Sequence, residues 1–168
     1  WIDDSLLVFV PGGEFIMGAT HDDNPQDYPE HPEHVVNQSG FWIYRSEVTN
    51  GMYANCVADG GCTSPATDIT TDYLNPEKRN HPVVGVDWYQ GQAYCSWADG
   101  HLPTEAQWEK TARGLEGNLY PWGEAAPVCD LLNFDNCVGE NLPSGTYLST
   151  TSPIRKYVDG ASYYEALD

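Results

Sequence analysis

The chain has 168 residues, and its 25 Asp and Glu against 7 Lys and Arg give a formal net charge of -18 at neutral pH. This charge argues against nucleic acid and anionic membrane surfaces as partners. Because 40% of the residues are hydrophobic and 12% are aromatic, the sequence is not that of a disordered chain. No apolar stretch is long enough to span a membrane. A length of 168 residues fits one domain, so we expect one folded domain over residues 1–168.

The first part of the chain predicts short strands and a polar loop. Residues 6–18 hold two apolar runs on either side of Pro11-Gly12-Gly13, a pattern typical of two short strands around a turn. Residues 20–34 are acidic and rich in Pro, which indicates a surface loop. Residues 41–48 form a further apolar run that predicts a strand.

Two helices are predicted next. Thr49 suits the N-cap of a helix over residues 50–58, and Asp87 suits the N-cap of a helix that runs to Ala98. Residues 63–82 between them are expected to form a polar loop. The helical period places four residues of the second helix on one face: Trp88, Gly91, Cys95 and Ala98.

A third helix has the clearest start signal in the chain. Thr104 and Gln107 have the spacing of a capping box, and Gly114 marks the end of the helix. Trp108 and Ala112 share one of its faces. A loop-rich tail follows, so the predicted class is α+β, with short helices, short strands and little regular structure.

The five cysteines predict local disulfides in an oxidising compartment. Cys56 and Cys62 bracket one short loop, and Cys129 and Cys137 bracket another. Zinc is the alternative, but it is usually bound by closer pairs such as Cys-x-x-Cys, so disulfides are favoured. Cys95 is then left over, and an odd cysteine in an exported protein predicts a partner elsewhere. We accordingly expect an extracellular or periplasmic protein.

Ordered blocks of characteristic sequence begin at the first strands and continue to the end of the chain. The blocks are Phe9-Val10-Pro11-Gly12-Gly13-Glu14-Phe15-Ile16-Met17-Gly18, Phe41-Trp42-Ile43, Glu47-Val48-Thr49-Asn50 with Tyr53, His81-Pro82-Val83-Val84-Gly85-Val86-Asp87-Trp88, Ala93-Tyr94-Cys95-Ser96-Trp97, Leu102-Pro103-Thr104-Glu105-Ala106-Gln107-Trp108-Glu109, Ala112-Arg113-Gly114, Tyr120-Pro121-Trp122-Gly123, Asn133-Phe134 and Ser162-Tyr163-Tyr164-Glu165-Ala166-Leu167-Asp168. Together they resemble the formylglycine-generating enzyme (sulfatase-modifying factor) family, and the central blocks form a highly specific signature.

The resemblance implies a loop-rich fold related to C-type lectins. It also implies relatives of several kinds: copper(I) oxidases that convert a sulfatase cysteine to formylglycine, iron enzymes of ergothioneine synthesis, pigment-maturation proteins and non-catalytic extracellular modules. The oxidases bind copper through two cysteines in the C-terminal part of the domain, and none of the cysteines here matches that pair by position. We therefore assign no catalytic residue and expect copper only if residues beyond Asp168 supply the thiolates. By the same resemblance, Cys95 pairs with a cysteine near the end of a complete domain, so we expect this domain to be truncated at its C-terminus.

A calcium site is a further implication of the resemblance. In the family an Asn side chain and the next carbonyl bind the ion together with a later Asp and another carbonyl. Asn133 and Phe134 match the first two, whereas residues 145–148, which match the later Asp, contain no carboxylate. Calcium needs several oxygen ligands, so another side chain would have to replace that Asp. The candidates are Asp135, Glu140 and Asn141.

Two further patterns are weaker candidates. The segment from His21 to His34 contains histidines and carboxylates, the residue types of a transition-metal site, but a solvated loop is favoured because the segment is Pro-rich. Asn37-Gln38-Ser39 is an N-glycosylation sequon.

Three hypotheses for function follow, and they leave open whether the protein is an enzyme. The first is an extracytoplasmic, lectin-like binding or structural module whose loops face a protein, a glycan or a neighbouring subunit. The second is the N-terminal part of a copper-dependent formylglycine-generating oxidase that acts on sulfatase cysteines. The third is a subunit of an extracellular assembly whose fold is completed by residues beyond Asp168 or by another chain, because an unfinished fold exposes strand edges and apolar surface.

Overall fold

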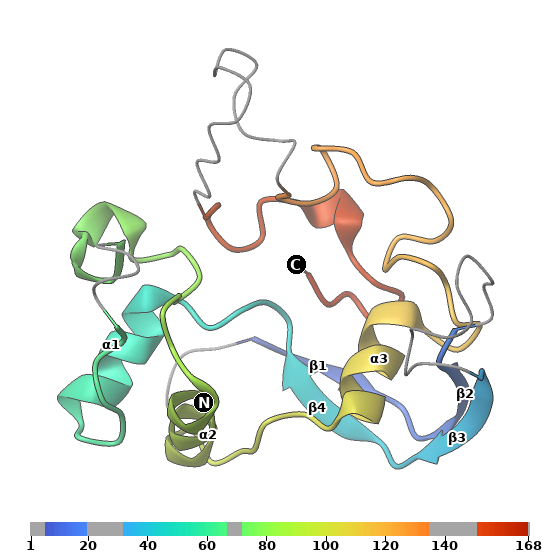
Figure 1. Cartoon of the computed structure of the whole chain (residues 1–168), viewed down its shortest axis with the longest axis horizontal. Helices are drawn as coiled ribbons and strands as arrows, with labels where there is room; N and C mark the ends of the chain where they lie inside the picture. The colour runs from blue at the N-terminus through green and yellow to red at the C-terminus, as the bar shows by residue number, and fades with distance from the viewer. Residues whose placement is uncertain (1–5, 20–31, 67–71, 135–150, 168) are drawn as a thin grey trace.

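The computed structural model describes residues 6–19, 32–66, 72–134 and 151–167, in which short helices and strands alternate with long loops (Figure 1). The strands are β1 (Leu7–Val10), β2 (Gly13–Met17), β3 (His34–Gln38) and β4 (Phe41–Tyr44). The helices are α1 (Asn50–Ala58), α2 (Trp88–Trp97) and α3 (Glu105–Arg113), with single 3-10 turns at Asp72–Leu74, Pro76–Lys78 and Val158–Gly160. The predicted α+β class with little regular structure is confirmed.

The four strands form one bent, two-stranded ribbon. β1 pairs with β4 and β2 pairs with β3, both antiparallel. The register is continuous from the Leu7–Tyr44 pair to the Met17–His34 pair, so the chain does not reverse at Pro11-Gly12 but bends there, opposite Ser39-Gly40. A side chain at Gly12 would bring its Cβ to 2.9 Å from the backbone nitrogen of Gly40, which explains the glycine at the bend.

The strand predictions were right in part. The two strands around Pro11 are confirmed, and the strand predicted over residues 41–48 ends at Tyr44. The sequence patterns do not predict β3, and its first residue, His34, falls in the predicted surface loop. The pairing of β3 with β2 depends on contacts between distant parts of the chain, which local sequence patterns do not encode.

Lys110 on α3 supports the bend from inside. Its side chain is fully buried, at 0% exposure, and Nζ donates hydrogen bonds of 2.9 Å to the carbonyl oxygens of Pro11 and Gly13. The ammonium also lies 5.7 Å from the centroid of the Phe15 ring. Because the strand ladder is interrupted at the bend, these bonds give the two carbonyl groups a donor and tie α3 to both sides of the bend.

The last turn of α3 fixes the end of β2 in the same way. Glu109 Oε1 accepts hydrogen bonds of 2.7 Å from the Gly18 amide and from Arg113. The Arg113 guanidinium also donates to the Gly18 carbonyl, and to the carbonyl oxygens of Gly117 at 2.8 Å and Asn118 at 2.9 Å. One half-buried ion pair therefore joins the helix, the strand and the following loop.

The predicted boundaries of the helices are confirmed. Thr49, Asp87 and Thr104 are the N-caps, the last two with complete capping boxes. Trp108 is 62% exposed, and the buried residues of α3 are Lys110 and Thr111. α3 packs its polar face against the bend because the backbone carbonyls there need donors.

In α2, Trp88 is exposed, whereas Tyr94 and Ala98 are buried. Tyr94 stacks on Tyr53 of α1, with ring centroids 5.6 Å apart, and this pair forms the centre of the core between the two helices.

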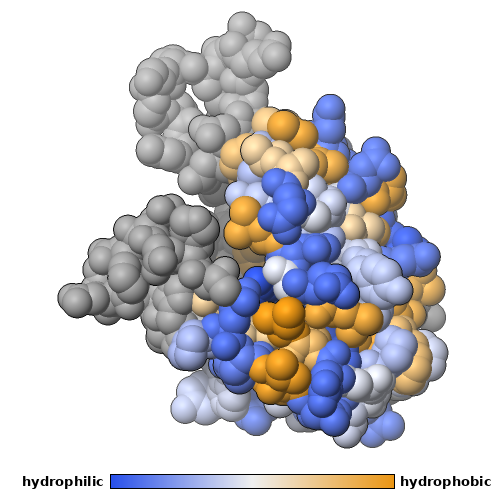
Figure 2. Space-filling model, turned by 90° about the vertical axis from the view of Figure 1, so that its right-hand side faces the viewer, coloured by the Kyte–Doolittle hydropathy of each residue, from blue (hydrophilic) through white to orange (hydrophobic). Residues whose placement is uncertain are grey.

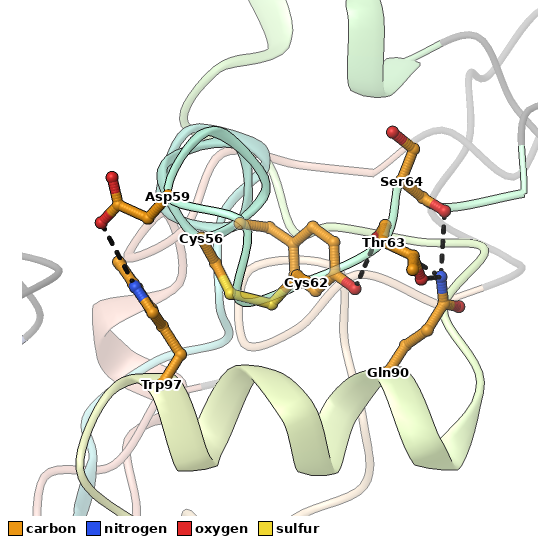
Figure 3. The surroundings of a disulfide bond; sticks show 8 residues. Cys56, Asp59, Cys62, Thr63, Ser64, Gln90 and Trp97 are labelled. Carbon is orange, nitrogen blue, oxygen red and sulfur yellow. Dashed lines mark hydrogen bonds between the residues drawn. A yellow bond between two sulfur atoms is a disulfide. The ribbon is translucent and has the colours of Figure 1, made fainter.

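The Cys56–Cys62 disulfide closes the loop after α1 beside this core (Figure 3). Two side chains of α2 hold the same loop: Trp97 donates to the carboxylate of Asp59 at 3.3 Å, and Gln90 donates to the carbonyl of Ser64 at 2.9 Å (Figure 3). The predicted disulfide is present and belongs to a rigid connection between α1 and α2.

Several large hydrophobic side chains of the described residues are exposed. Phe9 and Trp42 contact each other across β1 and β4, with ring centroids 5.1 Å apart, yet both face solvent. On the face shown in Figure 2, hydrophobic residues stand in small groups among hydrophilic ones. The other exposed tryptophan and aliphatic side chains include Val35, Trp88, Trp108 and Leu119.

Candidate functional site

The candidate site is a small polar pocket of about 90 Å³ that brings together three separate parts of the chain. Glu47 comes from the turn between β4 and α1, and Asn133 comes from the long loop after α3. The remaining wall is formed by the segment that follows residue 150: Ser152, Pro153 and Tyr157.

The segment after residue 150 is fixed by hydrogen bonds within itself and to the loop that precedes α2. The Ser152 and Tyr157 hydroxyls lie 3.1 Å apart and close this segment on itself. The Ile154 amide donates to the Asn80 carbonyl at 3.0 Å, and the His81 ring contacts the Thr151 hydroxyl at 2.9 Å. The pocket wall is therefore held on the loop that precedes α2, and its polar groups are positioned before any ligand binds.

Asn133 is the predicted calcium residue that the structure places at a pocket. It is half-buried and lines the pocket, and Phe134 beside it is half-buried as well. The candidates Asp135, Glu140 and Asn141 lie outside the described residues, so the structure does not place them. Glu47 was missed by the sequence reasoning, although it belongs to the Glu47-Val48-Thr49-Asn50 block that carries the family resemblance.

The donor chemistry of the pocket fits a hard cation in type. A carboxylate from Glu47, an amide oxygen from Asn133 and a hydroxyl from Ser152 are ligands that calcium prefers, although calcium takes about six to eight oxygens. Among the described residues no group of three His, Cys, Asp or Glu side chains could hold a metal ion. The described part of the pocket would thus supply some of the ligands of such a site, with others coming from backbone carbonyls, water or neighbouring residues.

None of the described cysteines lines this pocket. Cys56 and Cys62 are bonded to each other, and Cys129 is also disulfide-bonded. Cys137, its predicted partner, lies outside the described residues. Cys95 is a half-buried residue of α2 that packs against the core formed by Tyr53 and Tyr94.

The other sequence candidates are separated from the pocket or undescribed. Of the segment from His21 to His34, the structure describes only the last three residues; His34 is exposed on β3 and its ring nitrogen lies 3.0 Å from the Pro32 carbonyl. Asn37 of the sequon is exposed on β3. No helix in the described residues combines the length and apolarity needed to cross a membrane.

Comparison with solved structures identifies the class of fold. The structure of PvdO from Pseudomonas aeruginosa matches with a TM-score of 0.63, covering 95% of this chain and 67% of that chain at 22% sequence identity. The chain is therefore a loop-rich α+β domain with the fold of that protein.

Sequence comparison identifies the family. Residues 4–162 match the sulfatase-modifying factor enzyme 1-like domain, so the chain belongs to this family. It is 30% identical to hercynine oxygenase of Mycolicibacterium smegmatis, over 83% of this chain and 40% of the relative. It is 33% identical to formylglycine-generating enzyme of Streptomyces coelicolor, over 70% and 50%, and 29% identical to inactive C-alpha-formylglycine-generating enzyme 2 of Mus musculus, over 71% and 51%. The chain spans about half the length of these relatives or less.

Proposed function

We propose that this chain is an exported binding or structural module of the sulfatase-modifying factor family, whose loops are positioned by disulfides and by a calcium ion in the Glu47–Asn133 pocket. The disulfides support an extracellular or periplasmic location, because such bonds persist in oxidising compartments. The similarity to a relative that is named inactive supports a role for this scaffold without the oxidation of cysteine.

The observation that carries this proposal, which concerns this chain alone, is the state of the described cysteines. A copper(I) centre of the oxidase type needs two thiolates at close range. Cys56, Cys62 and Cys129 are disulfide-bonded, and Cys95 packs against the core of α1 and α2. The test is to incubate the protein with copper and a sulfatase-derived cysteine peptide and to measure aldehyde formation. We expect none, and aldehyde formation at a rate above that of copper alone would contradict the proposal.

The second candidate is a copper-dependent formylglycine-generating oxidase that contains this chain as its N-terminal part. It is favoured by the 33% identity to formylglycine-generating enzyme of Streptomyces coelicolor. In such a protein the thiolates would come from residues outside this chain, and α1, α2 and the bent ribbon would serve as the supporting scaffold. A third candidate, a subunit of an extracellular assembly, is favoured by the exposed Phe9–Trp42 pair. Aldehyde formation by the longer protein would select the oxidase.

The calcium proposal is tested by thermal unfolding. A ligand that binds only the folded state at 100 times its Kd stabilises it by about 2.7 kcal/mol, so calcium should raise Tm and a chelator should reverse the rise. Glu47→Gln should reduce the shift because it removes the carboxylate that lines the pocket. Glu77→Gln, at an exposed site outside the pocket, is the matched control and should leave the shift unchanged. Equal shifts in both variants, or no shift in the native protein, would rule out the site.

A further inference from the structure

The few basic residues of this acidic protein are unevenly distributed. Residues 76–81 and 151–159 contain four of its seven Lys and Arg but two of its 25 Asp and Glu, a local excess of two positive charges in a chain of net charge -18. The four residues are Lys78, Arg79, Arg155 and Lys156, called the basic cluster below. The other three Lys and Arg are engaged elsewhere: Lys110 is buried at the bend, Arg113 pairs with Glu109, and Arg45 pairs with Glu165.

Tertiary structure brings the two halves of the basic cluster together. The hydrogen bond from the Ile154 amide to the Asn80 carbonyl and the contact between the His81 ring and the Thr151 hydroxyl hold the two segments side by side and antiparallel. Arg79 precedes Asn80 in the sequence, and Arg155 follows Ile154. Because Asn80 and Ile154 are hydrogen-bonded, the backbones of the two arginines are neighbours although they lie far apart in sequence. Within the described residues, none of the four side chains forms an ion pair with a carboxylate.

The scaffold also positions the individual charges. Arg79 and Arg155 are exposed, and the stem of Arg79 lies so close to Gly51 of α1 that a Cβ there would be 2.7 Å from its Cγ. The Lys156 ammonium lies 4.8 Å from the centroid of the Tyr157 ring, which is buried and forms one wall of the pocket. The stem of Arg79 and the ammonium of Lys156 are therefore each positioned by a neighbouring element, and both residues are exposed.

Arg155 has an unfavourable backbone conformation. Its φ is 63°, in the left-handed region that favours glycine, and the cost for other residues is about 1 kcal/mol. Backbone strain of this kind is concentrated at functional sites, where the side chain is needed for more than stability. An arginine at this position loses stability that a glycine would retain, and its guanidinium forms no ion pair in the described structure that would compensate.

We propose that the basic cluster binds a small ligand that carries an oxyanion: a carboxylate, sulfate or phosphate group. Arginine guanidinium groups bind such groups through paired, charge-assisted hydrogen bonds. The acidic groups nearest in sequence, Glu77 and Asp159, are exposed and flank the cluster, and Glu47 lies in the adjacent pocket. A compact anion can contact the basic cluster alone, whereas a long polyanion would extend over a surface that carries the remaining acidic residues and would be repelled.

The test is a titration with inorganic phosphate and, separately, inorganic sulfate at low ionic strength, with a chelator present so that calcium binding plays no part. NMR shifts or calorimetry should show binding to the native protein. Arg155→Gly should weaken binding about tenfold, the usual effect of losing a charge-assisted hydrogen bond. Its Tm should be unchanged or higher than that of the native protein, because glycine tolerates the left-handed backbone. A loss of binding without a loss of stability separates the proposal from a general disruption of the fold.

Arg45→Gln is the matched control. It removes one positive charge from an arginine outside the basic cluster, so it should change binding less than twofold. Arg79→Gln should weaken binding as Arg155→Gly does. Equal weakening by Arg45→Gln would show a general charge effect and overturn the proposal, as would the absence of any binding of phosphate and sulfate. Tighter binding of a long sulfated polysaccharide than of the inorganic ions, lost in Arg79→Gln, would overturn the assignment to a small ligand.

Discussion

Lys110→Met should destabilise the protein although methionine is the more hydrophobic residue. The substitution keeps an unbranched stem beside Phe15 but removes the donor for the carbonyl oxygens of Pro11 and Gly13, each now bonded at 2.9 Å. A hydrogen bond from a charged donor contributes about 1.5–3 kcal/mol, and the removal of a buried ammonium offsets part of the loss of two such bonds. We expect a net loss of about 2 kcal/mol, which in a domain of this size lowers Tm by about 4–8 °C.

The same variant gives a test of the charge state. Burial lowers the pKa of Lys110 below its usual 10.5, so near that pH the unfolded chain binds more protons at this site than the folded protein does. The free energy of unfolding of the native protein therefore gains a contribution that rises as pH approaches 10.5, and Lys110→Met lacks it. Burial raises the pKa of Tyr53 and of Tyr164, but both tyrosines are present in both proteins and cancel in the comparison.

Urea unfolding of both proteins at several pH values measures these effects. Lys78→Met, at a half-exposed position with no side-chain bond to the bend, is the control and should change stability by less than about 0.5 kcal/mol. The reasoning is refuted if Lys110→Met is as stable as the native protein, or if the difference between the two does not grow as pH rises toward 10.5.

Three further predictions concern other contacts. The double variant Cys56→Ser, Cys62→Ser should lose about 2 kcal/mol, the loop-closure contribution of a bond between residues six apart, measured by urea unfolding; an unchanged midpoint would contradict this. Arg113→Met should lower the free energy of unfolding by about 3 kcal/mol, because Glu109 is left partly buried without its partner. Arg45→Met, at a more exposed pair, should lower it by less than about 1 kcal/mol, and equal losses would refute the distinction. Glu165→Gly should be neutral or raise stability by up to about 1 kcal/mol in thermal unfolding. The φ of Glu165 is 64°, which favours glycine, and its ion pair to Arg45 is long, at 3.8 Å. A clear loss of stability would show that the ion pair contributes to it.

The sequence predicted best what depends on neighbours along the chain. All three helices begin at their predicted caps, because a capping side chain bonds to a backbone amide two or three residues away. The Cys56–Cys62 bond was also predictable, since its short loop keeps the two sulfurs close in any fold. For the candidate site, the sequence and the family resemblance selected Asn133 but not the residues that surround it.

Only the tertiary structure determined which faces are buried and which distant residues meet. The burial of Lys110 depends on carbonyl groups 97 and 99 positions away, which become its acceptors only when the ribbon bends over α3. Glu47 joins Asn133 in one pocket, and Arg79 comes beside Arg155, through the hydrogen bonds of the segment after residue 150. Sequence periodicity records the hydrophobicity of residues but not the position of unpaired backbone groups, and in this loop-rich protein those groups decide how the helices, the ribbon and the candidate sites are arranged.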